Sequence, residues 1–374
     1  MVGQIERWVA TMVLLRGVRS LWNKMTEYAE TYYDKMNEIR VVTGKTEEDA
    51  EALGERYRDL AREMMVSSTS IAEAAVTYFR QGLEDEDVEE RLRYTTMYAK
   101  VAGVEFSEAA ELMTAAMNGM GLSADHVADV WLYLGDSAGT SGEEIGLAMQ
   151  KTAASADMVG LSFEKLGAYI ATMSEKTRQA PQVIGTALSS MFARLQQIKE
   201  KGFNEEDETR INDIAKALDT VGLSLMDDNG EWIAFDAILE GLAERWTTLT
   251  DKEQAYIATT LGGTRQRNYL LTLLNDLSEA TGEQSRAMEL YNGAMQAAGV
   301  TMEKYAVWQE SVAAAQGALT AELERFYSIL SANTIKGFLN VLTNIMKHIN
   351  NVTEATNGWN IKIGLAVGLL GALA

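Results

Sequence analysis

Side chains suited to acid–base catalysis are scarce in this sequence. Its two histidines, His126 and His348, lie far apart, and neither has a metal-ligand spacing such as H-E-x-x-H. We expect His126 to be a surface residue in the first turn of a helix, after a cap at Ser123. There is no cysteine, which excludes disulfides and thiolate chemistry. Catalysis needs a nucleophile, a base and an orienting group that converge. We therefore predict no enzyme activity, no cofactor and no metal for this segment.

Two short motifs resemble ion sites but lack an essential residue. If Asp227-Asp228-Asn229-Gly230 were a calcium loop, Leu225 would stand where the first carboxylate is required. Gly262-Gly263-Thr264, followed by Arg265 and Arg267, lacks the lysine and the spacing of a phosphate-binding P-loop. A glycine pair before threonine also ends one helix and caps the next. We interpret the first motif as a turn and the second as a helix corner.

The elements that would position these residues are helices. One proline among 374 residues is far below the usual share, and proline breaks helix interiors while loops tolerate it. Hydrophobic residues make up 47% of the chain, enough for a packed core. The sequence therefore predicts an all-α fold, a multi-helix array of helical hairpins.

The charge balance is acidic, with 33 basic and 54 acidic residues and a net charge of −21. Nucleic-acid binding uses clustered lysine and arginine, so we predict no sequence-specific nucleic-acid partner. The same acidity favours solubility.

A recurring corner divides the predicted helices. A glycine suited to the left-handed conformation precedes an apolar residue and then a hydroxyl residue that could cap the next helix. The five corners are Gly103-Val104 with Ser107, Gly121-Leu122 with Ser123, Gly160-Leu161 with Ser162, Gly222-Leu223 with Ser224, and Gly299-Val300 with Thr301. Ser141 with Glu144, and Thr250 with Glu253, have the spacing of capping boxes.

One segment departs from this pattern. In residues 221–235, Asn229-Gly230 stands between two apolar runs and predicts a small β-hairpin. Further on, Val312, Leu319 and Phe326 recur every seven residues, which indicates a coiled-coil-like seam. The predicted domains are long N-terminal helices (1–100), a helical core with the hairpin (101–299), a coiled-coil-like helix (300–350) and an apolar segment (358–374).

The apolar segment has two interpretations. Its run IGLAVGLLGALA is shorter than the roughly 20 residues of a transmembrane helix. It is either the start of a membrane-compatible helix in a longer protein or a buried core helix.

Three stretches resemble one known family, the phage tail tape measure proteins. They are MNEIRVVTGKTEEDAEAL (36–53), SSTSIAEAAVTYFRQGL (67–83) and GLAERWTTLTDKEQAYIATTLGGTRQRNYLLTLL (241–274). The resemblance covers roughly residues 30–330. The three stretches in this order are more specific for the family than any one of them alone. The matching motif positions are Trp246, Ala258, Gly262, Gly263, Arg265 and Asn268.

This resemblance implies a structural ruler that lies in the lumen of the virion tail, sets tail length and templates tail-tube assembly. The implied partners are tail-tube and tail-tip proteins, tail assembly chaperones and other copies of the chain. The protein would be in the host cytoplasm during assembly. On ejection it would reach the host membrane or periplasm through its apolar segment and aid genome delivery. Family proteins are usually longer, so we expect this chain to be a fragment.

Two other functions remain open. A membrane-active, pore-forming helical protein would use the C-terminal apolar run, and liposome leakage would distinguish it. A cytoplasmic helical scaffold unrelated to phage would stay a compact monomer beside tail-tube protein.

Overall fold

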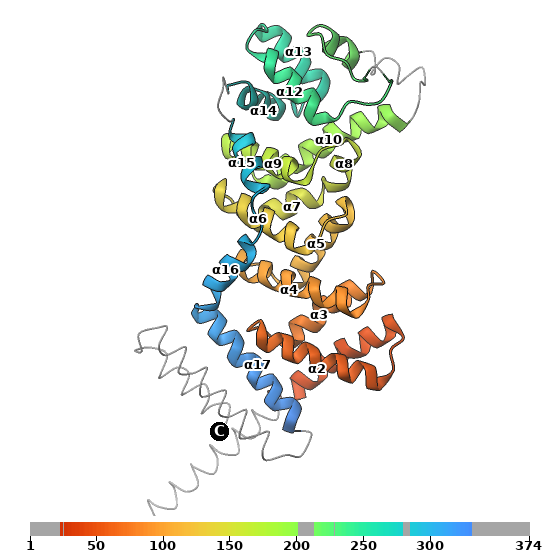
Figure 1. The fold of residues 1–374 in the computed structure, drawn as a ribbon, viewed down its shortest axis with the longest axis vertical. Helices are drawn as coiled ribbons and strands as arrows, with labels where there is room; N and C mark the ends of the chain where they lie inside the picture. Colours follow the sequence, from red (N-terminus) through yellow and green to blue (C-terminus); the bar gives the residue numbers. More distant parts are fainter. Residues whose placement is uncertain (1–22, 25, 201–212, 228, 280–284, 331–374) are drawn as a thin grey trace, which may run out of the picture. The chain divides into compact units, whose positions relative to one another are not determined.

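Figure 1 shows a computed structural model that describes residues 23–24, 26–200, 213–227, 229–279 and 285–330. Throughout this described part the regular structure is α-helix, which confirms the all-α prediction. The single proline, Pro181, is the first residue of a helix, where its missing N–H has no intrahelical role.

The chain folds into two compact units. The first combines Met1–Val101, Glu105–Ala110 and Met302–Ala374, and the second combines Ala102–Val104 and Glu111–Thr301. The first unit is therefore closed by segments from both ends of the described chain. The domain boundaries inferred from the sequence stay a prediction.

The first unit contains a helical segment at 23–43, two helices that pack on each other, and a late helix that returns to them. Helix α17 lies beside α2 (Figure 1). Its elements are 23–43, α2 (Glu47–Glu63), α3 (Ser68–Phe79), most of α4 (Asp85–Ala102), the start of α5 (Phe106–Met120), most of α16 (Val300–Gln309) and α17 (Val312–Leu330). Its largest fully buried side chains are aromatic or aliphatic: Tyr32, Ile39, Tyr57, Ile71, Tyr78, Leu92 and Tyr98.

The second unit is a set of short helices around a separate core. Its elements are the rest of α5, α6 (Ala124–Ser137), α7 (Gly142–Gln150), α8 (Ala153–Met158), α9 (Phe163–Thr177), α10 (Pro181–Glu200), a helical segment at 213–219, α12 (Phe235–Trp246), α13 (Asp251–Gly262), α14 (Arg267–Glu279) and α15 (Arg286–Ala294). Helix α9 packs against α15, α14, α10 and α6, so it is central to this unit. Trp131, Phe163, Tyr169, Phe192 and Trp246 are the largest buried side chains.

The glycine corners are confirmed. All five predicted corner glycines have φ between 66° and 88°. The hydroxyl caps are only partly as predicted. Ser162 accepts the N–H of Lys165 at 3.3 Å, whereas Ser123 caps α6 without a side-chain hydrogen bond. Thr301 lies inside α16, and its N–H is bonded to Asp129 instead.

The β-hairpin expected at 221–235 is not formed. Among the described residues, this segment has one isolated antiparallel bridge, Met226 with Trp232, and no strand. The carboxylate of Asp227 accepts the N–H groups of Asn229 (2.9 Å) and Glu231 (2.8 Å). These bonds close a wider loop in which Gly230, at φ 80°, follows the turn instead of forming its centre. One bridge is too short to count as a hairpin.

The heptad seam accounts for only part of the buried face of α17. Leu319 and Phe326 are buried, but Val312 and Leu323 are half-buried. The region is also two helices, because the chain breaks between α16 and α17. The coiled-coil prediction for 331–350 and the apolar segment at 358–374 lie outside the described residues. Within the described part, no helix is both long and apolar enough to cross a membrane.

Glycine at position 317 allows α17 to approach α2 closely. A Cβ atom added at Gly317 would overlap the carbonyl oxygen of Met65, a residue held at φ 51°. At Gly54 on α2, by contrast, an added Cβ would meet only the Tyr32 hydroxyl and the Met36 methyl, at 3.4 and 3.6 Å.

These two helical glycines give a matched pair of substitutions. Gly317→Ala is expected to lower the free energy of unfolding by about 1–3 kcal/mol, because the methyl overpacks against backbone. Gly54→Ala is expected to raise stability by up to about 1 kcal/mol, from helix propensity. Thermal unfolding of the full chain measures both, and equal stabilities for the two variants would contradict the close approach.

Candidate functional site

Trp246 joins three helices of the second unit. It ends α12, and its side chain is 1% exposed. Its Nε1–H donates to the side-chain oxygen Oδ1 of Asn275 on α14 at 2.6 Å, and its backbone carbonyl accepts from Gln254 Nε2 on α13 at 2.8 Å. The capping box predicted at Thr250 and Glu253 is present and starts α13 beside this tryptophan. Trp246 therefore fixes how α12, α13 and α14 pack.

The end of α13 needs two small residues. Ala258 is fully buried, and a Cβ on Gly262 would come within 3.4 Å of Arg267 Cα and Leu270 Cδ2 on α14. Gly263 has φ 77° and donates its N–H to Thr259 at 2.8 Å, so it is the C-cap. The Arg194 guanidinium occupies the space where a Gly263 side chain would begin.

Two of the family-motif residues are exposed instead. The side chains of Arg265 and Asn268 face solvent at and after the α13–α14 corner. Within the motif, Trp246 lies beside the start of α13, Ala258 is buried along it, and Gly262 and Gly263 form the corner at its end, whereas Arg265 and Asn268 are exposed. The phosphate-loop interpretation finds no support here, because the N–H groups of Gln266 and Arg267 are bonded to the Gly263 carbonyl.

The acidic turn is likewise satisfied internally. Hydrogen bonds from backbone N–H groups, that of Glu231 foremost, lower the pKa of Asp227. Among the described residues no cluster of three or more His, Asp and Glu side chains could hold a metal ion.

His126 lies in the first turn of α6, as expected, and is paired with an acid. Its Nε2 is 2.6 Å from Glu164 Oε1 on α9. This hydrogen bond raises the pKa of His126 and lowers the pKa of Glu164. The sequence indicated the position of the histidine but gave no signal for its partner. The second histidine, His348, lies outside the described residues.

This pair predicts a pH dependence of stability. The histidine contribution is present below its unfolded pKa, near 6.5, and is lost as pH rises through the raised folded pKa. The glutamate contribution is present above its unfolded pKa, near 4.5, and is lost as pH falls through the lowered folded value. The difference in melting temperature between wild type and His126→Gln should therefore be largest between about pH 5 and 6.5 and shrink by about pH 8. A constant difference across that range would contradict the ion pair.

Two buried aspartates cap helices from a distance. Asp129 is 5% exposed, and its carboxylate accepts the N–H groups of Gly299 and Thr301, both at 2.7 Å, where α16 begins. Asp276 is 3% exposed and accepts the N–H of Ala287 at 2.9 Å in the first turn of α15. Lys176 neutralises Asp276 at 2.7 Å. Helix N-termini favour negative charge, so both carboxylates stabilise the helices they reach.

The first unit uses the same device. Glu324 on α17 accepts hydrogen bonds from Ser67 Oγ (2.6 Å), Ser68 N–H (2.6 Å) and Ser68 Oγ (2.7 Å) at the start of α3. Burial raises the pKa of Glu324, while these bonds act in the opposite direction. Arg62 and Arg325 add ion pairs at 2.8 Å to Glu322 and Asp59. The charges of α17 therefore fasten it to α2 and α3.

We expect Asp129→Ala to destabilise the second unit by about 1–3 kcal/mol, because two buried N–H groups lose their acceptor. Hydrogen exchange followed by mass spectrometry should show faster exchange at Gly299 and Thr301. The exposed Asp219→Ala is the control and should leave that exchange unchanged. Slow exchange in Asp129→Ala would show that this cap does not hold the start of α16.

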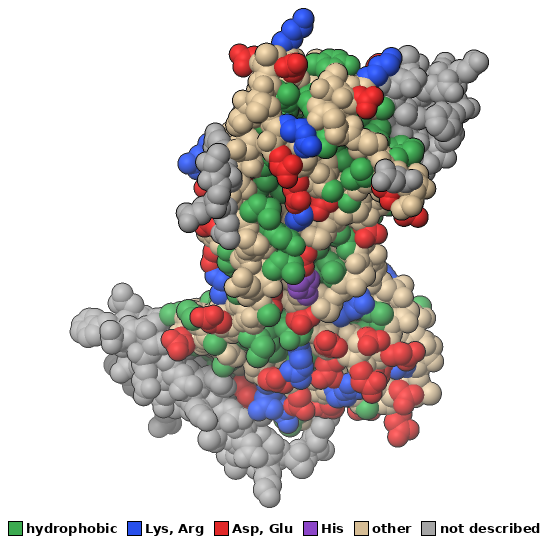
Figure 2. All heavy atoms as spheres, turned by 45° about the horizontal axis from the view of Figure 1, so that its top comes forward, with side chains coloured by type: hydrophobic (Ala, Val, Ile, Leu, Met, Phe, Trp, Pro, Cys, Tyr) green, Lys and Arg blue, Asp and Glu red, His purple; other side chains and the backbone are tan. Residues whose placement is uncertain are grey.

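The surface agrees with the acidic composition. On the face drawn in Figure 2, acidic and basic side chains lie interspersed among patches of hydrophobic side chains. Most of the ion pairs are part-exposed, such as Arg56 with Glu89 at 2.5 Å, and such pairs contribute little each.

These features define an all-helical protein of short helices joined at glycine corners. The model of the phage-related minor tail protein family matches residues 47–263, more than half of the chain. The chain belongs to this family, and membership indicates a structural role in the phage tail beside other tail components. The match begins at the first residue of α2 and ends at Gly263, so it includes Trp246, Ala258 and Gly262 but stops before Arg265 and Asn268. No solved structure shows a significant match to the chain.

Proposed function

We propose that this chain acts as a tail tape measure, a ruler without catalytic activity that lies in the tail lumen and templates tail-tube assembly. Family membership is the observation that carries the proposal. The high helix content of the described residues supports it, because an α-helix that is drawn out advances about 1.5 Å per residue and makes length proportional to chain length. The segment that contains Trp246, the acidic cap and the pair Gly262-Gly263 is the most distinctive part of the resemblance.

The proposal includes assembly with tail-tube and tail-tip proteins, with tail assembly chaperones and with other copies of the chain. The protein would be made in the host cytoplasm, stored in the tail and expelled to aid genome delivery. Arg265 and Asn268 are exposed beside a rigid corner, so they are suitable contacts for a tail partner. Engagement of the host membrane would rest on the apolar segment 358–374.

Tail length in phage carrying altered copies of this gene tests the proposal. Deleting the 28 residues 303–330 should shorten the tail by roughly 40 Å, and duplicating them should lengthen it by the same amount, at about 1.5 Å per residue. The change is measured by electron microscopy averaged over many particles. Both changes in tail length follow from the number of residues removed or added, if the segment is an extended helix in the tail.

The control is Gly317→Ala, which disturbs the packing of α17 without changing chain length. Tails of this variant should keep the wild-type length. Infectious particles whose tails have unchanged length after the deletion would contradict the ruler and favour the membrane-active alternative. A length change in Gly317→Ala tails would show that packing, and not residue number, determines length.

A further inference from the structure

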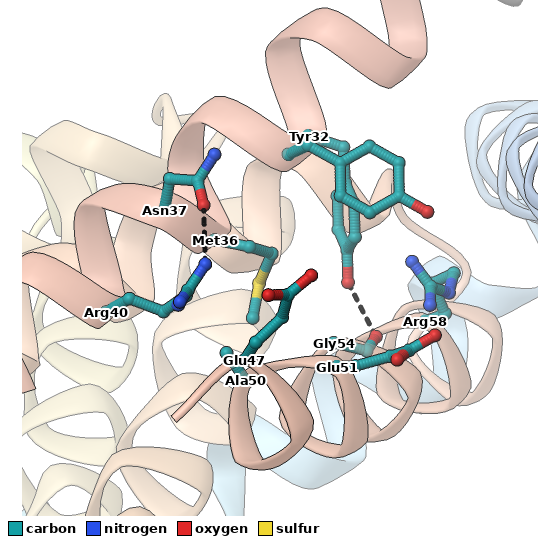
Figure 3. A pocket seen from close by; sticks show the side chains of 10 residues that line it. Tyr32, Met36, Asn37, Arg40, Glu47, Ala50, Glu51, Gly54 and Arg58 are labelled. Atoms are coloured by element: carbon teal, nitrogen blue, oxygen red, sulfur yellow. Dashed lines mark hydrogen bonds between the residues drawn. The ribbon is translucent and has the colours of Figure 1, made fainter. Parts of the chain in front are cut away.

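The first unit contains a pocket of about 190 Å³ between the helical segment 23–43 and α2 (Figure 3). The α2 side of the pocket is formed by residues at helical spacing, Glu47, Ala50, Glu51, Gly54 and Arg58. Tyr32, Tyr33, Met36, Asn37 and Arg40 line the opposite side. The volume is that of an amino-acid side chain, several times the roughly 30 Å³ of one water molecule.

Arg58 is the unusual member of this lining. The residue is 5% exposed, and its Nη2 donates to Glu55 Oε1 at 2.8 Å. Its Nε and Nη1 are buried without a hydrogen-bond partner among the described residues. Burial lowers the Arg58 pKa, but the hydrogen bond to Glu55 and the neighbouring Tyr32 and Tyr28 together raise it above its ordinary value, so all its N–H donors are retained.

The fixed position of Arg58 suits recognition. Its guanidinium carbon lies 4.9 Å from the centroid of the Tyr32 ring, and the Tyr32 hydroxyl is bonded to the Gly54 carbonyl at 2.6 Å. A buried donor left without an acceptor is destabilising, because it has lost its hydrogen bonds to water. A ligand that offers an acceptor to this guanidinium would recover that cost.

The other charges of the pocket decide what kind of acceptor fits. Glu47 and Glu51 are exposed at the mouth, where Figure 3 shows their side chains rising from α2, and Arg40 lies opposite. The lining thus carries two arginines and two glutamates. A carboxylate ligand would meet repulsion from the glutamates, and an ammonium ligand would meet repulsion from the arginines. A neutral group with both an acceptor and donors avoids both.

We propose that this pocket binds a primary amide, whose carbonyl oxygen accepts from Arg58 and whose NH₂ group donates to a glutamate at the mouth. The short carbon chain of such a ligand would lie against Tyr32 and Met36, which are buried in the pocket wall. The amide is either a free small molecule or the side chain of asparagine or glutamine on a protein. This inference does not depend on the ruler function.

The test is a titration of the full chain, with ¹³C-labelled methionine methyl groups, against three probes of one size: propionamide, propionate and propylamine. The Met36 methyl signal, assigned with Met36→Leu, reports the pocket. Propionamide should shift it saturably and bind at least tenfold more tightly than either charged probe. If propionate binds as tightly as propionamide, the assignment is overturned. It is also overturned if no probe shifts the Met36 signal, because the pocket then holds only water.

Two variants test whether propionamide binds in this pocket. Gly54→Ala places a methyl group at ordinary contact distance from Tyr32 and Met36, so the helix stays folded while the pocket shrinks. It should weaken propionamide at least tenfold. Arg58→Met should do the same by removing the donors, whereas Arg80→Met, exposed and outside the pocket, should not. Unchanged affinity in folded Gly54→Ala would overturn the proposal.

Two blocked amino acids separate the sources of the amide. N-acetylglutamine methylamide presents the propionamide group on a peptide backbone, and N-acetylalanine methylamide is its control. Binding of the glutamine compound as tightly as propionamide would identify a protein side chain as the ligand. If the glutamine compound does not bind while propionamide does, the ligand is a small free amide.

Discussion

The capping of helix N-termini by buried carboxylates is the interaction on which the rest of this structure depends. A fold of many short helices exposes many unpaired N–H groups, and short isolated helices are only marginally stable in water. Glu324 and Asp129 reach helix starts 256 and 172 residues away in the chain. Each carboxylate accepts backbone N–H groups that have no acceptor nearby in the sequence. The same hydrogen bonds fix the position of the helix. The hydrophobic cores supply most of the stability, but these carboxylates specify which helix end meets which.

Local signals in the sequence account for much of the fold. A glycine that ends a helix and a hydroxyl that begins one act within four or five residues, so Gly121, Gly160 and the cap at Thr250 could be predicted without tertiary information. Trp246 could also be located as part of a packed region, because a tryptophan followed by an acidic cap and a glycine pair is a specific combination. Its bond to Asn275 could not, since nothing in the sequence distinguishes that asparagine from its neighbours.

The incorrect predictions, the β-hairpin and the heptad seam, have one physical cause. In both regions, hydrogen bonds to side-chain carboxylates determine the structure, and the local pattern used for the prediction does not include them. Asp227 closes a loop with its carboxylate where a two-residue turn was expected. Along α17 the heptad pattern counted only apolar residues, yet Glu322 and Glu324 are also buried. Arg62 pairs with Oε1 of Glu322, and Ser67 and Ser68 donate to Glu324. Hydrophobic periodicity cannot show that a glutamate is buried when its partners lie elsewhere in the chain. The same limit applies to Arg58, whose burial follows from Tyr32 and Glu55.

The residues that the family model matches do not coincide with the residues of either compact unit. Residues 47–263 contain α2 and α3 but not α17, whose Glu324 caps α3 and whose Gly317 allows contact with Met65. They also contain Asp129 but neither Gly299 nor Thr301, which it binds. A segment cut at the family boundaries would therefore lose the hydrogen bonds that Ser68 and Asp129 make in the whole chain. Hydrogen bonds to a charged group contribute about 1.5–3 kcal/mol each, out of the roughly 5–15 kcal/mol that stabilises a typical domain. The smallest piece that keeps both caps extends at least from Ser67, at the start of α3, to Glu324 on α17.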